Sequence, residues 1–192
     1  MRKPKGYDEA QTYSDNYRLP AGGYVVKIMK AQLGRYENSG NEYLELTFDI
    51  SEGQYNGFYR KQYEESQFEP KKYKGTIRIN LPKEDGSEQD GWTIRTLKTQ
   101  MTAIEDSNEG YTWEWDESTL VGLTAGLLFR NKEYEYNGKQ GFWTEPFRFI
   151  AAEKVRSGDF TIPKDKLLNN GSQSYGAEHT DFTPLSDDEV PF

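Results

Sequence analysis

The sequence predicts an all-β protein, an OB-fold in which five strands form a partly open Greek-key barrel with one helix between the third and fourth strands. Three observations lead to this prediction. Short segments rich in Val, Ile, Tyr and Phe recur along the 192 residues and are separated by turn sequences. One segment has the apolar spacing of a helix, and it falls between the third and fourth strand-like segments. No internal repeat or second domain is evident in the sequence.

The first three predicted strands occupy residues 23–33, 43–50 and 75–81. The second and third alternate between apolar and polar positions, as a half-buried strand does. The turn sequence at residues 37–41 predicts that the first two strands form an antiparallel hairpin. Residues 54–74 form a long insertion before the third strand. The side chains that this alternation places on the solvent-facing side of the second strand are Tyr43, Glu45, Thr47 and Asp49.

The single predicted helix follows Asp90, which we expect to be its N-cap. Its apolar stripe consists of Ile94, Leu97, Met101 and Ile104. The fourth and fifth predicted strands cover residues 120–129 and 142–152, and the Asn137-Gly138 pair between them is a strong hairpin signal. We assign three further aromatic residues to the core: Trp92, Phe147 and Phe149.

Charge and composition divide the chain into three parts. The chain has 24 Lys and Arg against 32 Asp and Glu, a formal net charge of −8. Residues 169–192 contain five acids and no Lys or Arg, so 27 acids and 24 bases remain in residues 1–168, a net charge of −3. We therefore predict an N-terminal arm at 1–18, the OB-fold domain at 19–168 and a disordered acidic tail at 169–192.

Several classes of protein are disfavoured by what the sequence lacks. It has no Cys, no apolar run in its first twenty residues and no stretch of about 18 consecutive apolar residues. Its one histidine, His179, lies in the predicted tail, and no phosphate-binding glycine motif is present. Carboxylates cluster at residues 64–65 and 114–117, but adjacent acids in loops are usually only solvated. We expect a cytoplasmic protein that is no enzyme and has no catalytic residue, metal, cofactor or membrane contact.

Aromatic residues interleaved with basic ones are the recurring feature of the chain. Single-stranded nucleic acid needs this pairing, because its bases stack on aromatic rings and its phosphates bind cations. In an OB-fold such residues belong on strands two and three and on the loops that join strands one to two and four to five. The residues that we assign to a DNA-binding surface are Arg35, Tyr36, Tyr43, Tyr59, Arg60, Lys61, Lys71, Lys72, Tyr73, Lys74, Arg78, Arg130, Lys132, Tyr134 and Tyr136.

Each of these residues also has a structural interpretation. Strands favour aromatic residues in any case, and Tyr134 and Tyr136 could simply hold a hairpin together by cross-strand contacts. The basic run at residues 71–74 could be a solvated face. Trp113 and Trp115, which follow the predicted helix, fit either interpretation.

The last six residues form the most specific motif of the chain. Three acids are followed by an aliphatic residue, Pro and a terminal Phe: Asp187, Asp188, Glu189, Val190, Pro191 and Phe192. The Phe can fill an apolar pocket while its carboxylate and the acids meet basic residues, so we assign this segment to partner binding. It resembles the C-terminal tip of bacterial single-stranded-DNA-binding proteins, with Glu in place of one Asp and Val in place of Ile or Leu.

The body of the chain resembles a known family as well. The sequence Leu-Pro-Ala-Gly-Gly-Tyr at residues 19–24, followed by an apolar strand, and residues 43–53 are similar to a family of small proteins encoded by phages and prophages of Gram-positive bacteria. That family looks like a phage version of the single-stranded-DNA-binding proteins. The resemblance covers about residues 19–168, and it implies a role in phage DNA replication or recombination inside the bacterial host.

We interpret the chain as a protein that coats single-stranded DNA with little sequence preference and recruits replication or recombination proteins through its tail. The alternative from another class is a carbohydrate-binding β-sandwich whose exposed Trp and Tyr stack on sugars, although such a protein has no use for a docking tip. A phage structural or assembly protein would also leave the tail unexplained. The residues do not distinguish DNA from RNA, because no group that reads the 2′-OH is identified. They also leave homo-oligomerisation open, although related binders are often dimers or tetramers.

Overall fold

The computed structural model describes residue 3, residues 18–67 and residues 69–168 of the chain. The strands are β1 (Gly22–Arg35), β2 (Glu42–Ile50), β3 (Thr76–Asn80), β4 (Thr124–Tyr136) and β5 (Lys139–Ile150). The helices are α1 (Phe58–Glu65), α2 (Glu88–Glu105), the 3-10 helix η2 (Glu117–Leu120) and α3 (Ala152–Ser157). The prediction of a mainly β chain with five strands is confirmed. Of the α-helices in this part of the chain, only α2 was predicted.

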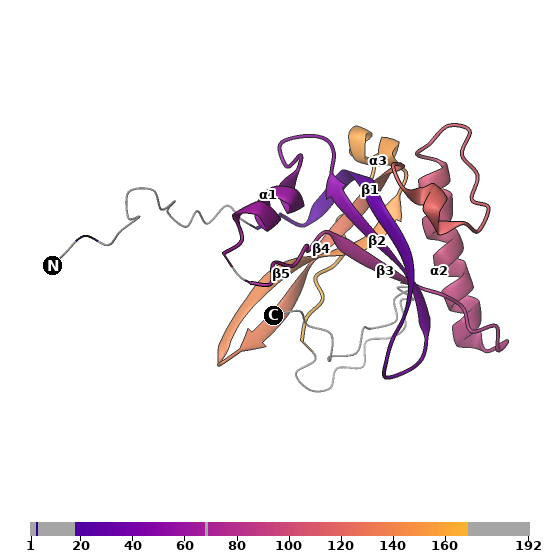
Figure 1. Cartoon of the computed structure of the whole chain (residues 1–192), viewed down its shortest axis with the longest axis horizontal. Coiled ribbons are helices and arrows are strands. Elements are labelled where there is room, and N and C mark those ends of the chain that lie inside the picture. Colours follow the sequence, from indigo (N-terminus) through magenta and orange to yellow (C-terminus); the bar gives the residue numbers. More distant parts are fainter. Residues whose placement is uncertain (1–2, 4–17, 68, 169–192) are drawn as a thin grey trace.

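All five strands join one antiparallel sheet in the order β3-β2-β1-β4-β5 (Figure 1). β1 lies at the centre and pairs with both β2 and β4, although β4 is about ninety residues further along the chain. β3 and β5, at the two ends of this order, are also in contact with each other. The sheet therefore curls back on itself and has an inner and an outer face.

The inner face of the sheet forms the core. The apolar positions predicted for the second strand are all buried, and so are Ile77 and Ile79 of β3. Large aromatic residues from three different strands fill the centre: Phe48, Phe129 and Phe149. α2 packs against this core and contacts β3, β4 and β5.

α2 begins earlier than the sequence predicted. Its N-cap is Ser87, whose hydroxyl accepts a hydrogen bond from the Asp90 backbone N–H. Asp90 is instead buried inside the first turn, where its carboxylate accepts from the Lys83 backbone N–H. Ile94 was also wrongly placed, because it is 49% exposed whereas the other three residues of the predicted stripe are buried. The apolar residues that α2 buries all lie in its second half, beginning at Leu97, so its first turns are not covered by the sheet.

Both hairpins that the sequence predicted are present. Asn137 and Gly138 have φ values of +50° and +72° and form the two-residue turn between β4 and β5. An irregularity in this pair leaves Phe147 as an extra residue on β5, because Leu128 pairs with Arg148 while Phe129 pairs with Pro146. Phe149 is in the core as predicted.

Two aromatic residues assigned to the core are only half-buried, so their assignment was wrong. The bulge turns Phe147 out of the core and brings it into contact with the arginines Arg130 and Arg148. Trp92 lies in the uncovered first half of α2, where its ring stacks with Arg95.

Asp49 is the clearest departure from the predicted strand faces. Its position in β2 alternates with the core residues, yet it is buried, because the segment that contains α1 folds over it. Its carboxylate accepts hydrogen bonds from the backbone N–H groups of Tyr59, at 3.0 Å, and Arg60, at 3.1 Å. These are two of the N–H groups that the first turn of a helix leaves without partners. Asp49 therefore fixes the start of α1.

The last described segment, residues 158–168, returns along β4. Phe160 covers Gly23, where an added Cβ would lie only 2.8 Å from the phenyl ring. Further on, Lys166 pairs in parallel with Lys132, on the part of β4 that extends beyond β1. Lys166 donates its N–H to the Asn131 carbonyl and accepts from the Glu133 N–H.

Candidate functional site

An aromatic cluster lies on the outer face of β2 and β3, where the sequence predicted one. Tyr36 and Tyr43 have ring centroids 4.5 Å apart, and the Arg78 guanidinium lies 4.6 Å from the Tyr43 centroid and 5.7 Å from that of Tyr36. The Tyr36 hydroxyl donates to the Asn80 side-chain oxygen at 3.1 Å. We call Tyr36, Tyr43 and Arg78 the tyrosine cluster.

Strand register brings the tyrosine cluster together. Tyr43 of β2 faces Gly34 of β1 on one side and Asn80 of β3 on the other. The Tyr43 ring lies over Gly34, where an added Cβ would be 2.5 Å from ring carbons. A side chain at position 34 would displace the Tyr43 ring, so Gly34 supports the geometry of the cluster, which the aromatic–basic pattern did not reveal.

A second group lies along the β4–β5 hairpin. Arg130, Lys132, Tyr134 and Tyr136 alternate with the residues that continue the core face of β4, and they stand on the outer face. Cross-strand neighbours join them: Arg130 lies 4.7 Å from the Phe147 ring centroid and Lys132 lies 5.1 Å from that of Trp143. Near the hairpin tip Tyr134 is 45% and Tyr136 is 61% exposed.

This second group, defined as Arg130, Lys132, Tyr134, Tyr136, Trp143 and Phe147, is called the hairpin cluster below. The sequence analysis did not include Trp143 or Phe147 in it. Trp143 could have been found from the register of the Asn137-Gly138 hairpin, which places it opposite Lys132. No local signal predicts Phe147, because its position depends on the bulge.

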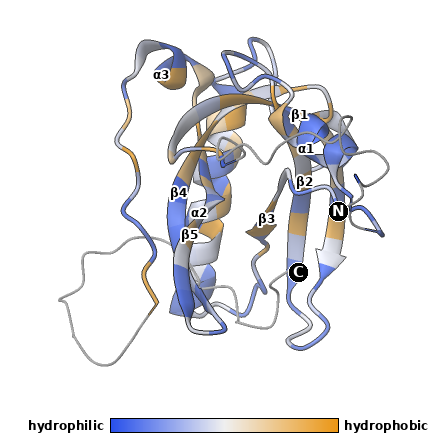
Figure 2. Cartoon of the chain, turned by 90° about the vertical axis from the view of Figure 1, so that its left-hand side faces the viewer, coloured by the Kyte–Doolittle hydropathy of each residue, from blue (hydrophilic) through white to orange (hydrophobic). Residues whose placement is uncertain are grey.

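The two clusters lie on the outer face of the same sheet, on hairpins that point the same way. In two perpendicular views the β1–β2 and β4–β5 hairpins extend toward the same end of the molecule, with β3 between them (Figure 1 and Figure 2). The strands and connections that carry the clusters are those predicted to form the binding surface.

Each of the three cations in these two clusters has a carboxylate partner. Arg78 pairs with Glu45 at 2.9 Å, and Arg130 pairs with Glu145 at 2.7 Å. Glu145 also lies 3.8 Å from the Lys132 ammonium group. Where β1 ends and β2 begins, Arg35 pairs with Glu42 at 2.6 Å. A phosphate approaching these cations therefore meets groups that already have an anionic partner.

The structure separates the remaining predicted residues from these clusters. Tyr59 is 6% exposed and packs edge-to-face on Phe48 at 5.5 Å, so its assignment to a binding surface was wrong. Tyr73 packs partly buried against the core, and its hydroxyl donates to the Phe48 carbonyl at 3.1 Å. Burial is the main cause that raises the pKa of both tyrosines above the usual range. These two aromatic residues are structural.

The basic residues next to these tyrosines point outward. The exposed ones are Arg60, Lys61, Lys72 and Lys74, while Lys71 is half-buried. The Lys71 ammonium group donates to the Glu64 carbonyl at 2.9 Å and lies 5.9 Å from the Tyr63 ring centroid. α1 lies away from both hairpin tips (Figure 1). The chain therefore carries two basic regions, and one is separate from the aromatic clusters.

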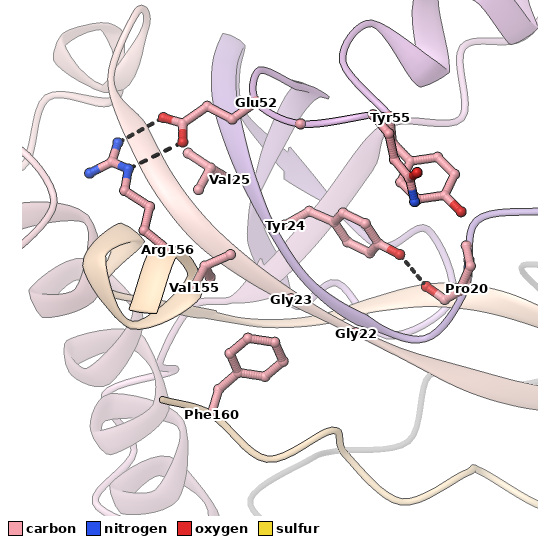
Figure 3. Close-up of a pocket in the computed structure, with 12 residues that line it drawn as sticks. Pro20, Gly22, Gly23, Tyr24, Val25, Glu52, Tyr55, Val155, Arg156 and Phe160 are labelled. Carbon is pink, nitrogen blue, oxygen red and sulfur yellow. Dashed lines mark hydrogen bonds and ion pairs between the residues drawn. The ribbon is translucent and has the colours of Figure 1, made fainter. Parts of the chain in front are cut away.

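A shallow hollow of about 510 Å³ lies beside the start of β1 (Figure 3). Aromatic side chains of Tyr24, Tyr55 and Phe160 line it, and a two-bond ion pair between Glu52 and Arg156 stands at its side. The Tyr24 hydroxyl donates to the Pro20 carbonyl at 2.8 Å. Burial raises the pKa of Tyr24 to about 12.

The two charged side chains of this hollow, Glu52 and Arg156, pair with each other, so it offers aromatic surface but little for a charged ligand. The hydrogen bonds from Arg156 hold the pKa of Glu52 below its usual range. Nothing in the sequence pattern indicated that these residues would meet.

Some predictions fall outside the described residues or concern what they lack. The whole partner-binding segment, from Asp187 to Phe192, lies outside them, as does His179. Within residues 18–67 and 69–168, no group of three or more acidic or histidine side chains is arranged to hold a metal ion. In the same part of the chain no helix is long and apolar enough to cross a membrane.

Comparison with known proteins adds one match. No curated protein matches the chain. A family model described as "Protein of unknown function (DUF669)" matches residues 5–77, which include β1, β2, α1 and two of the three residues of the tyrosine cluster. That description assigns no activity, so the chain is similar over these residues to a family whose function its name leaves open.

Proposed function

We propose that this protein binds single-stranded DNA along the outer face of its sheet, through the tyrosine cluster and the hairpin cluster. The observation that carries the proposal is the placement of two groups of aromatic rings with cations on one face of one curled sheet. Bases stack on such rings whatever their sequence, at about 1–3 kcal/mol each. The reaction is binding alone, with no chemical step and no cofactor.

The strand order supports an OB-fold as the scaffold. An OB-fold is a Greek-key barrel of five strands that stays partly open. Here β1 pairs with β2 and β4, while β3 and β5 contact each other at the ends of the sheet. α2 lies between the third and fourth strands of the chain, the position predicted for the single helix.

The carbohydrate-binding alternative receives less support. A β-sandwich consists of two packed sheets, whereas the five strands of the described residues form one sheet. The most exposed aromatic residue of the described chain, Trp115, stands apart from both clusters on the connection after α2. A continuous sugar-binding platform would require the exposed rings to lie together.

We also propose the wider role that the sequence suggests. The protein coats single strands during phage DNA replication or recombination in the host cytoplasm. Residues Asp187 to Phe192 capture partner proteins in a basic-rimmed apolar pocket. This part of the proposal rests on the sequence motif.

The test is a titration of the full chain with a short oligo-dT and with a duplex of the same length. We expect the single strand to quench tryptophan fluorescence at low salt, since Trp143 lies in the hairpin cluster. Tyr36→Ala with Tyr43→Ala should weaken binding about tenfold or more, because two stacking platforms are lost.

The matched control is Tyr63→Ala, which removes an aromatic ring that is 39% exposed on α1. It should leave affinity for the short oligonucleotide unchanged. If oligo-dT neither quenches fluorescence nor shifts mobility at low salt, the proposal is wrong.

A further inference from the structure

Trp115 is an exposed tryptophan on a backbone that disfavours it. The side chain is 76% exposed, and φ is +66°, in the left-handed region. A residue other than glycine pays about 1–2 kcal/mol for that conformation, and burial of the indole does not offset the cost here. Large exposed aromatic residues of this kind are typical anchors of protein interfaces.

The segment around Trp115 is fixed in place. The Trp113 backbone N–H donates to the Glu105 carboxylate of α2 at 2.8 Å, and the Tyr111 and Thr119 hydroxyls lie 2.9 Å apart. Asp116 caps η2 by accepting from the Ser118 N–H at 2.9 Å. The two indole rings lie 6.1 Å apart, with Trp113 packed against the core. Trp115 is therefore presented by an ordered support.

Acidic residues surround this tryptophan in the sequence. Residues 99–129 contain six acids and no Lys or Arg. Four of the six are exposed, namely Asp106, Glu109, Glu114 and Asp116. We call Trp115 with these four residues the acidic tryptophan surface. It repels a phosphate backbone, so its partner carries positive charge.

The same chain carries a surface of the complementary kind. Arg60, Lys61, Lys72 and Lys74 are exposed around α1 and make no ion pair with any described residue. Beside them Tyr63 is 39% exposed and offers an aromatic ring to an incoming indole. We call Arg60, Lys61, Tyr63, Lys72 and Lys74 the α1 surface.

The two surfaces lie on different sides of the molecule. α1 is on one side of the curled sheet, whereas α2 and the connection that carries Trp115 are on the other (Figure 1). Each surface is therefore too far round the molecule to meet the other within one chain, and both remain accessible to a neighbour.

We propose that the acidic tryptophan surface of one copy docks on the α1 surface of the next copy. Because the two surfaces differ, the contact is head-to-tail and does not close into a two-fold dimer, so copies add in a row. The association needs no DNA. Its use, to line up copies along a single strand and make the coating cooperative, rests on the proposed function.

Charge reversal at each surface gives the sharpest test. The first variant carries Glu109→Lys and Glu114→Lys, and the second carries Lys61→Glu and Lys72→Glu. In sedimentation velocity of the full chain without DNA, each variant alone should lose concentration-dependent association, because reversal of two of its four charges leaves the altered surface with no net charge to attract the other surface. An equimolar mixture of the two should associate again, because the unaltered acidic tryptophan surface of the second variant meets the unaltered α1 surface of the first.

A neutral variant tests the anchor. Trp115→Ala keeps every charge and should weaken self-association about tenfold or more. Tyr136→Ala, which removes an aromatic ring that is 61% exposed at the tip of the β4–β5 hairpin, is the matched control and should not change self-association. Association that survives both charge reversals, or a mixture that stays monomeric, overturns the proposal. A closed two-fold dimer that depends on Trp115 also overturns it.

Binding to an oligo-dT that holds one copy separates this proposal from the function. Trp115→Ala, which keeps every charge, should bind that oligonucleotide as the unaltered chain does, whereas on a long single strand its binding should lose cooperativity. If the unaltered chain binds no oligo-dT but still associates as described, the function is wrong and the contact stands.

Discussion

At the scale of single residues, Asp49 shows how a side chain outside the expected pattern organises its surroundings. It is buried and forms no ion pair with any described residue, and its two oxygens accept hydrogen bonds from the backbone N–H groups of Ile50, Tyr59 and Arg60. Alternation along β2 correctly predicted which residues fill the core, because that depends only on the period of a strand. It could not predict that α1, ten residues later, would fold over a carboxylate on the other face.

Asp49→Ala should therefore destabilise the fold. The change leaves buried N–H groups without acceptors, at a cost of about 1–3 kcal/mol. Urea unfolding measures this as a lower midpoint with an unchanged slope. Thr47→Ala, two residues earlier on the same strand, should change stability by no more than about 0.5 kcal/mol. An Asp49→Ala chain as stable as the parent would show that the carboxylate is not needed to begin α1.

At the scale of elements, local patterns predicted the hairpins and α2 but neither α1 nor α3. Turn residues at 37–41 and 137–138 act on their direct neighbours, so they can be read from the sequence. α1 has no side-chain cap from its own N-cap residue, Gly57, because its cap comes from the strand before it. It buries only Tyr59, and α3 has only six residues, so neither shows a helical apolar stripe.

The same limit applies to the candidate site. The tyrosine cluster follows from strand alternation and a predictable hairpin. Tyr59 and Tyr73 were misassigned, because a basic neighbour in the sequence does not show which way a ring points. The carboxylate partners of Arg78 and Arg130 were missed as well, since cross-strand pairing depends on register rather than on nearby sequence.

α3 is joined to the loop after β2 by the Glu52–Arg156 pair, and this contact should depend on pH. Hydrogen bonds from Arg156 lower the pKa of Glu52 in the folded state, so the folded chain binds fewer protons there than the unfolded chain. The pair thus stabilises the fold above the unfolded Glu pKa of about 4.3, and this contribution is lost as pH falls through the lower folded pKa.

Arg156→Gln should lower stability at pH 7 by no more than about 1 kcal/mol, since both side chains are partly exposed. The difference from the parent should shrink as pH falls below about 4. Thermal unfolding of both chains between pH 3 and 7 checks this. Arg95→Gln, which removes the same charge from a residue stacked on Trp92, should show no such convergence.

At the scale of the whole molecule, a chain with a net charge of −8 is proposed to bind a polyanion. The two clusters reduce this conflict only in part, because Glu45 and Glu145 already hold their cations. A phosphate that binds Arg78 or Arg130 must displace a carboxylate. Stacking therefore supplies more of the affinity than the number of Lys and Arg would indicate.

Glu45→Gln with Glu145→Gln should raise affinity for oligo-dT and steepen its salt dependence. Cations freed from carboxylates attract phosphate directly, and each added phosphate contact makes the log–log salt slope steeper by about 0.7. Fluorescence titration from low to moderate salt measures both effects. Glu153→Gln with Glu88→Gln removes the same charge from exposed positions on α3 and α2. It should have little effect on affinity or on the salt slope. Unchanged affinity and slope in the double Glu45, Glu145 variant would place phosphate elsewhere on the surface.

The last described segment, which pairs with β4 at Lys166, also determines where a mechanical load enters the molecule. It is held by the two backbone hydrogen bonds that Lys166 makes with Asn131 and Glu133, and by the Leu168 N–H, which donates to the Glu133 carboxylate at 3.0 Å. Any pull on the chain beyond Leu168 reaches the β4–β5 hairpin first, while the core strands are still shielded. Tension at that end would therefore strain the hairpin cluster before it strains the fold.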